Sequence, residues 1–385
     1  IDTMYNPDDR ERIVNWENSN RAVDPTTDLQ DREHNQPWPR GRTNHYLFDL
    51  NRDWLPVTQP ESEGRVKLVH HWRPLFLLDV HEMGANSTYF FQPGIKSRIN
   101  PNTPQEGIDL TYKLAPFFAK RLDDIKSLYY SEESFDDFYY GKGSTYGDIH
   151  GSVGILFEQA SSRARETDSN QGKLTYAFSV RNQYIATLGA VDGLVALRNE
   201  FLKYQRNFYA KSAEVASKNK VKGYLINLKE NRTRAQMLVK TLQRHRIEAY
   251  ALKKSITIKG KRFAKGDAII IPTNQPQTRF IAGIMEEVTT FEDSLFYDVS
   301  AWTLPLAFGV DYHEVKQRPD AFLGAKINDI NIDGGKLNGG KASSAYLMPW
   351  DRYYNPKSLY RILNAGILPR LTLSLIHISE PTRPY

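Results

Sequence analysis

LFLLDVHEMG, at residues 75–84, is the stretch that decides the fold. Its first six residues, 75–80, are apolar apart from Asp79, and the run is short enough for a strand buried in a parallel sheet. His81 and Glu82 follow at once, so this strand ends in polar side chains. Open α/β sheets collect their active sites at the carboxyl ends of strands, so the stretch predicts a sheet with a site at its edge.

Two further apolar runs end in polar residues in the same way. Residues 151–157 (GSVGILF) predict a buried strand that ends at Glu158, and residues 46–50 predict a strand that ends at Asn51 and Arg52. A turn, a surface charge or a hydrogen-bonded structural residue explains each end when it is taken alone. A carboxylate on a buried strand is costly unless it is paired or used, so Glu158 points most clearly to function. Three such strand ends in one segment indicate a functional site.

The expected fold class is α/β: a mixed, mostly parallel sheet with helices on both faces, followed by a smaller doubly wound α/β domain. The first unit is residues 1–215, with surface loops at residues 1–45 and helices at residues 111–130 and 178–216. The second unit, residues 219–316, alternates strand and helix patterns. The remaining segments are a linker, the start of a truncated further module, and a tail that resembles a translated sequencing adapter: residues 333–341, 342–372 and 373–385.

Composition excludes several classes of function. The 51 Lys and Arg are interspersed with 45 Asp and Glu, so the net charge of +6 indicates a solvated surface and no nucleic-acid partner. The sequence has no run of about eighteen apolar residues, so no membrane-spanning helix is expected. It has no cysteine, which excludes a thiol nucleophile, disulfides and cysteine-bound zinc.

Four short motifs, in this order, resemble those of the zinc carboxypeptidase family, the carboxypeptidase A-like metallopeptidases. They are YNPD (5–8), DLNRDW (49–54), LLDVHEMG (77–84) and GILFEQAS (154–161). The glycine that normally follows the first motif is Asp9 here. The resemblance covers about residues 4–200 and implies a secreted or periplasmic enzyme.

The resemblance implies Zn²⁺ as cofactor and hydrolysis of the C-terminal bond of a peptide or protein with a free C-terminus. His81 would be the third zinc ligand, and Glu158 would be the general base that takes a proton from zinc-bound water. Arg52, helped by Asn51, would bind the substrate carboxylate, because its planar fork suits paired hydrogen bonds to a carboxylate.

Two further roles in that family need an arginine and a tyrosine. Arg42, in preference to Arg40, would stabilise the oxyanion. Tyr140, in preference to its neighbour Tyr139, would close over the substrate. Side-chain specificity and oligomeric state stay open.

The family's first two zinc ligands lie in a His-x-x-Glu motif, and none occurs before Asn51. The resemblance therefore implies that these ligands lie upstream of Ile1 in a longer parent enzyme, and that this fragment is inactive by itself. Outside these motifs, His70 and His71 are expected to be structural, and His150 either is structural or lines the cleft.

The second unit resembles glutamine amidotransferase-like domains, but it has no cysteine to act as nucleophile and is expected to be non-catalytic. Two alternatives to a carboxypeptidase stay open. One is a catalytically dead peptide- or glycan-binding relative on the same scaffold. The other is an amidase that acts on cell-wall peptides or another amide, against which the presence of Arg52 argues.

Overall fold

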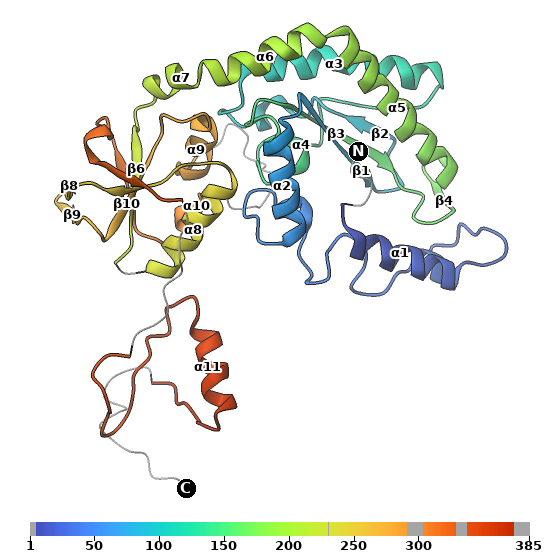
Figure 1. The fold of residues 1–385 in the computed structure, drawn as a ribbon. Helices are drawn as coiled ribbons and strands as arrows, with labels where there is room; N and C mark the ends of the chain where they lie inside the picture. Colours follow the sequence, from blue (N-terminus) through green and yellow to red (C-terminus); the bar gives the residue numbers. More distant parts are fainter. Residues whose placement is uncertain (1–4, 230, 291–302, 329–336, 373–385) are drawn as a thin grey trace.

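The structure, a computed structural model, describes residues 5–229, 231–290, 303–328 and 337–372. Figure 1 shows two sheets in separate parts of the chain, with a succession of helices leading from the first part to the second. The fold is mixed α/β. Among the described residues, no helix is both long and apolar enough to cross a membrane. The predicted adapter-like tail, residues 373–385, lies outside the described residues. So do residues 333–336 of the predicted linker.

The first sheet contains the predicted strand LFLLDV. Its order is β1-β3-β2, formed by β1 (Phe76–Met83), β3 (Val153–Ala160) and β2 (Tyr89–Phe91). β1 and β3 are parallel, as expected, whereas β2 pairs antiparallel with β3. Two of the three predicted strands are therefore present, and their carboxyl ends lie at the same edge of the sheet.

Helices cover this sheet with apolar side chains at helical spacing. α3 (Gln105–Asp124) buries Leu110, Leu114, Phe118 and Leu122 against β3 and the helices that follow. Each such side chain contributes roughly 1.5–3 kcal/mol when it is removed from water. The helix predicted at residues 178–216 is divided into three: α5 (Tyr176–Ala196), α6 (Arg198–Ala210) and α7 (Ser212–Lys218).

The second sheet differs from the predicted doubly wound arrangement. Its order is β11-β6-β10-β7-β12, and every neighbouring pair is antiparallel. The strands are β6 (Gly223–Asn227), β7 (Tyr250–Leu252), β10 (Ala268–Pro272), β11 (Tyr312–Val315) and β12 (Leu323–Lys326). The expectation of a doubly wound second domain was therefore wrong. The expectation that the first sheet is mostly parallel was also wrong, because it has one parallel and one antiparallel pair.

The reason lies in the connection between β7 and β10. α8 (Arg232–Arg244) links β6 to β7, which is the expected strand–helix–strand unit. The chain then runs through the hairpin of β8 (Ile256–Ile258) and β9 (Lys261–Phe263), without a helix, before β10. Parallel neighbours need a long crossover, whereas β10 returns directly and enters antiparallel between β6 and β7.

Two local predictions in the first fifty residues were also wrong. Residues 46–50 form a turn in which the Asn44 side chain accepts hydrogen bonds from the backbone N–H groups of Tyr46 and Phe48. Residues 7–20, expected to be a loop, form α1 (Pro7–Asn20), which Asn6 caps by accepting from the Asp9 N–H.

The two parts share an apolar core. α2 (Pro60–Trp72) and the segment around Trp54 and Tyr146 pack against α8 and α9 (Thr278–Met285). The buried side chains of this shared core include Leu55, Val66, Tyr146, Leu238, Leu242, Phe280 and Ile284.

Candidate functional site

His81 and Glu158 lie directly opposite each other on the parallel strands β1 and β3. Successive side chains on a strand alternate between the faces of the sheet, so residues in register share a face. Asp79 lies two residues before His81 and points to that same face. The strand pattern thus brings a histidine and two carboxylates together at one edge.

Asn51 joins this group from a short helical turn, Leu50–Arg52. Its Nδ2 lies 3.2 Å from Asp79 Oδ2 and 2.8 Å from His81 Nε2. The same His81 nitrogen lies 2.9 Å from Asp79 Oδ1. On its other side, Asn51 Oδ1 accepts from the Gly143 N–H at 2.9 Å. Asn51 is therefore held in place on both sides and connects three segments of the site.

Two glycines allow this close approach. A Cβ on Gly143 would lie 2.7 Å from Asp79 Oδ2, and a Cβ on Gly154 would lie 1.7 Å from the Ser144 carbonyl oxygen. Side-chain atoms do not tolerate such distances, so the loop that carries Gly143 packs against β1 and β3 only because both positions lack a side chain.

The electrostatics of the three facing groups are coupled. Burial alone would raise the pKa of Asp79, but the neighbouring His81 and the hydrogen bonds from His81 and Asn51 lower it below its ordinary value. Burial alone would lower the pKa of His81, but the carboxylates of Asp79 and Glu158 raise it. Asp79 and His81 thus form an ion-paired unit beside Glu158.

Glu158 is different, because burial is the largest influence on its pKa. Burial raises the pKa of Glu158 from its ordinary 4.5 to about 7, although His81 acts in the opposite direction. Its Oε2 is buried and has no hydrogen-bond partner among the described residues. A carboxylate with a pKa near neutrality is suited to act as a general base.

The two arginines predicted for the site lie beside it. Arg42 Nε donates to Asp49 Oδ2 at 2.9 Å, and its positive charge acts on both His81 and Glu158. Arg52 is half-buried, and its Nη1 donates to the Asn51 carbonyl oxygen at 2.9 Å.

The tyrosine predicted to close over the substrate is not brought to this edge. Tyr140 is buried, its hydroxyl lies 3.2 Å from Thr103 Oγ1, and its ring packs near Phe280 in the shared core. Its neighbour Tyr139 lies nearer, since its hydroxyl donates to the Arg52 carbonyl oxygen at 3.1 Å.

Sequence reasoning missed two residues that support the site. Gln183 Nε2 donates to the His81 carbonyl oxygen at 2.8 Å, and Gln183 Oε1 accepts from the Tyr89 hydroxyl at 2.8 Å. Tyr89 is fully buried; burial, together with the charge of Glu158, raises its pKa well above the ordinary value. Gln183 lies far along the chain on α5, and only its position in a helix packed on β3 reveals the contact.

The His81 ring has one nitrogen left for a metal ion. Its Nε2–H donates to Asp79 Oδ1, so Nδ1 is the ring nitrogen that would bind a metal. A carboxylate behind a metal-binding histidine is the usual arrangement, because it fixes the ring and increases its basicity. One histidine does not make a site, so further ligands are required.

A second group of potential metal ligands lies elsewhere. Within the part of the chain that the structure describes, His70, His150 and His245 place one ligand atom each within 4.8 Å of the others. Burial lowers the pKa of His70 to about 4 and of His245 to about 3, and holds that of His150 well below its ordinary value. His70 lies in the last turn of α2.

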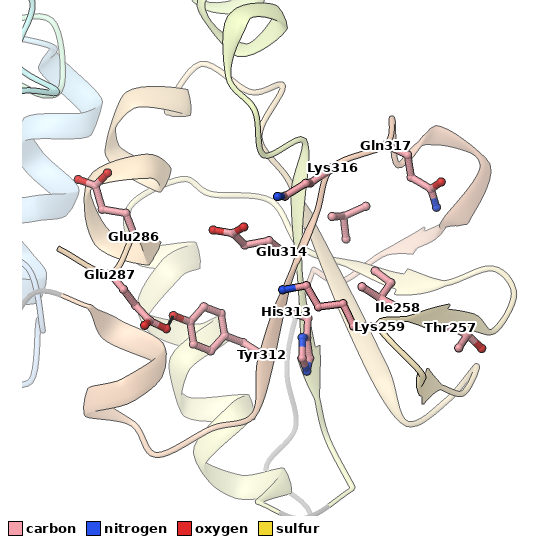
Figure 2. A pocket seen from close by; sticks show the side chains of 11 residues that line it. Thr257, Ile258, Lys259, Glu286, Glu287, Tyr312, His313, Glu314, Lys316 and Gln317 are labelled. Carbon is pink, nitrogen blue, oxygen red and sulfur yellow. Dashed lines mark hydrogen bonds between the residues drawn. The ribbon is translucent and has the colours of Figure 1, made fainter. Parts of the chain in front are cut away.

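The second sheet carries an open cleft of about 780 Å³, which Figure 2 shows from close by. Its lining is polar and of mixed charge, and none of the predicted site residues belongs to it. The lining residues include Lys259, Glu286, Glu287, Tyr312, His313, Glu314 and Lys316.

Comparisons with known proteins do not assign this chain to a family. No family model matches the sequence, and no curated protein matches it significantly. Among solved structures, a metallo-carboxypeptidase from Burkholderia cenocepacia aligns with 43% of this chain at 15% identity and a TM-score of 0.33. The alignment spans 44% of that protein's chain. A similarity this low carries no argument, so any peptidase activity of this chain rests on the site itself.

Proposed function

We propose that the chain carries part of the active site of a zinc metallocarboxypeptidase, which hydrolyses the C-terminal bond of a peptide. The observation that carries this proposal is the position of Glu158: a carboxylate with a raised pKa and a buried oxygen without a partner, directly opposite His81 on parallel strands. Such a carboxylate costs stability, which is expected where catalysis needs a base.

In this proposal, His81 would hold zinc through Nδ1 while Asp79 fixes its ring, and zinc would supply a Lewis acid that makes water nucleophilic at neutral pH. Glu158 would accept a proton from the water that attacks the peptide carbonyl carbon and pass it to the leaving amine. Arg42 stabilises negative charge that develops on the carbonyl oxygen, and Arg52 binds the C-terminal carboxylate.

Asn51 needs a modified role in this scheme. Its amide already donates to Asp79 and accepts from the Gly143 N–H, so in this arrangement it positions the carboxylate that holds His81 rather than the substrate. The substrate carboxylate is then bound chiefly by Arg52, and substitution of Arg52 tests this role. His81 alone does not hold zinc, so zinc binding at this edge of the sheet needs further protein ligands.

The test is to express the protein from its complete gene and to assay release of the last residue from peptides with free and amidated C-termini. Zinc-dependent release from the free peptides alone supports the proposal. Hydrolysis of both kinds at equal rates indicates an amidase on the same scaffold. Peptide binding without hydrolysis indicates a non-catalytic relative and removes the role of Glu158 as base.

A further inference from the structure

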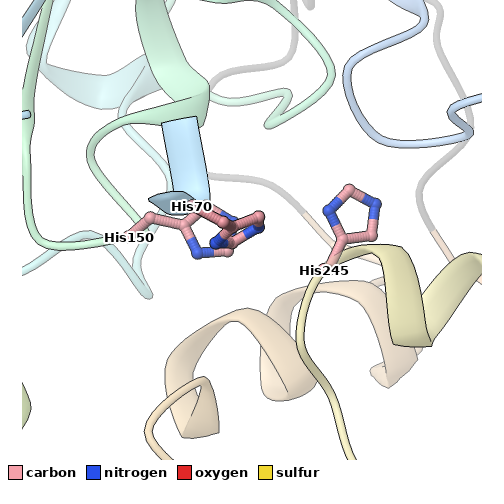
Figure 3. A group of neighbouring side chains, drawn as sticks. All are labelled: His70, His150 and His245. Carbon is pink, nitrogen blue, oxygen red and sulfur yellow. The ribbon is translucent and has the colours of Figure 1, made fainter. Parts of the chain in front are cut away.

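Three histidines from distant segments meet where the two parts of the chain join. His70 lies in the last turn of α2, His150 lies between α4 (Gly143–Tyr146) and β3, and His245 directly follows α8. Figure 3 shows the three side chains, each attached to a different segment of the chain. Their ligand atoms lie within 4.8 Å of one another.

Hydrogen bonds settle which nitrogen of His245 faces the group. His245 Nε2 lies 2.8 Å from the Leu55 carbonyl oxygen, which can only accept, so Nε2 carries the proton. The lone pair is therefore on Nδ1, which lies 2.7 Å from the Tyr146 hydroxyl. A metal-binding histidine typically donates its other N–H to a backbone carbonyl in this way.

The other two histidines supply the remaining nitrogen atoms. His70 Nε2 lies 2.9 Å from the same Tyr146 hydroxyl. Because that hydroxyl donates its one proton to His245 Nδ1, His70 Nε2–H donates to the hydroxyl oxygen, and the lone pair of His70 is on Nδ1. His150 is buried, and its Nε2 has no hydrogen-bond partner among the described residues. A buried polar atom without a partner is costly, and a bound ion would remove that cost.

We propose that His70, His150 and His245 form a binding site for a divalent transition metal ion of the zinc type, separate from the site at His81. Imidazole nitrogen atoms suit Zn²⁺, Cu²⁺ and Ni²⁺. Tetrahedral zinc with bonds of about 2.0–2.1 Å places its ligand atoms roughly 3.4 Å apart, so a contraction of up to about 1.4 Å from the present spacing is needed. The bound ion would tie α2 to the end of α8 and so join the two parts of the chain.

A cleft reaches one member of this group, His70. It has a volume of about 490 Å³ and is lined by His70, together with Arg73, Tyr209 and Arg246. The two arginines oppose a free cation, and they also favour an anion such as chloride or hydroxide as the fourth ligand. The Tyr146 hydroxyl, which bridges two of the histidines, must give up at least one of these hydrogen bonds when the ion binds.

The experiment uses the full chain with His81→Ala in place, so that zinc at the proposed hydrolytic site does not contribute. After chelation, Zn²⁺ is titrated by calorimetry, and the melting temperature is measured with and without Zn²⁺. We expect one zinc per chain and an upward shift of several degrees, since a ligand that binds only the folded state stabilises it.

His150→Gln is the decisive variant, because its Nε2 makes no hydrogen bond and its replacement should leave the fold intact. It should melt as its parent does without zinc, yet bind zinc at least tenfold more weakly and lose the shift. Tyr146→Phe is the matched control and should retain binding. Absence of zinc binding in the His81→Ala chain, or equal binding by His150→Gln, would overturn the proposal.

Discussion

The Glu158 carboxylate lies opposite the His81 imidazole on adjacent parallel strands, at the edge of the sheet where the Asn51 amide also contacts Asp79. His81 is paired with Asp79 at 2.9 Å, whereas Glu158 has a buried oxygen without a partner. One carboxylate thus positions the histidine, and the other stays available for proton transfer.

The first prediction concerns Glu158→Gln in the protein expressed from its complete gene. Removing a general base should lower kcat by roughly 10²–10⁴-fold, while bound zinc stays unchanged. Glu82→Gln is the matched control, because Glu82 belongs to the next register pair and points to the opposite face of the sheet. Residual activity within a few-fold of the parent would exclude Glu158 as the base.

The second prediction is the pKa of Glu158 in the metal-free chain. Because burial raises it, carboxyl NMR should show titration at about 7 rather than at the ordinary 4.5. His81→Ala removes a positive charge that acts against this shift, so the pKa should rise further. The protonated form dominates below the pKa, so the base form appears only as the pH rises through it. A pKa near 4.5 in the parent chain would contradict the burial argument.

The third prediction concerns substrate binding by Arg52. Arg52→Ala in the complete protein should raise KM for peptides with a free C-terminus, because the charged, paired hydrogen bonds to the carboxylate are lost. Amidated peptides serve as the matched substrate control and should be little affected. An equal loss of kcat/KM on both kinds of peptide would argue against a carboxylate-binding role.

The sequence predicted part of this site well, because that part is local. LFLLDVHEMG and GSVGILFEQ each carry the apolar run and the polar end in adjacent residues, so β1, β3 and the polar residues at their ends follow from the sequence. The register that places His81 opposite Glu158 is known only from the structure. Residues 46–50 have a similar apolar composition, yet they form a turn because Asn44 bonds the backbone at two positions. Composition does not distinguish these cases.

What depends on packing between distant segments could not be predicted. Tyr140 lies close in sequence to the site residues, but the shared core with Phe280 buries it. Likewise, β10 enters the second sheet antiparallel because of a hairpin whose place in space the sequence does not reveal. The histidines at positions 70, 150 and 245 lie in three separate segments, and no local motif connects them.

The fourth prediction tests the close approach at Gly143. Gly143→Ala places a Cβ 2.7 Å from Asp79 Oδ2, so the loop or Asp79 must move. We expect a loss of about 1–3 kcal/mol in the free energy of unfolding. Gly84→Ala is the matched control, because no atom lies within 4 Å of its added Cβ. Equal stability of the two variants in denaturant titrations would contradict the packing described for this loop.

The fifth prediction uses the buried carboxyl group of Asp137. Burial raises its pKa from 3.8 to about 6, so the folded chain binds this proton more tightly than the unfolded chain. The stability that this protonated group contributes is present below pH 3.8 and is lost as the pH rises from 3.8 to about 6. Asp137→Asn should therefore become more stable relative to the parent across that interval. Denaturant titrations at several pH values check this, and a constant difference between the two would contradict it.

Asp136 provides the opposite case for comparison. It forms a buried ion pair with Lys142 at 2.8 Å, so Asp136→Asn removes the carboxylate of that pair and leaves the buried lysine charge poorly compensated. That variant should be destabilised by roughly 3–5 kcal/mol.

The most direct test of the central claim counts zinc in the protein expressed from its complete gene, with His150→Gln present so that only one site contributes. The account predicts about one zinc per chain, together with release of C-terminal residues, and predicts that His81→Ala removes both. Zinc content and hydrolysis that are unchanged by His81→Ala would contradict the assignment of this strand end as part of a metallocarboxypeptidase active site.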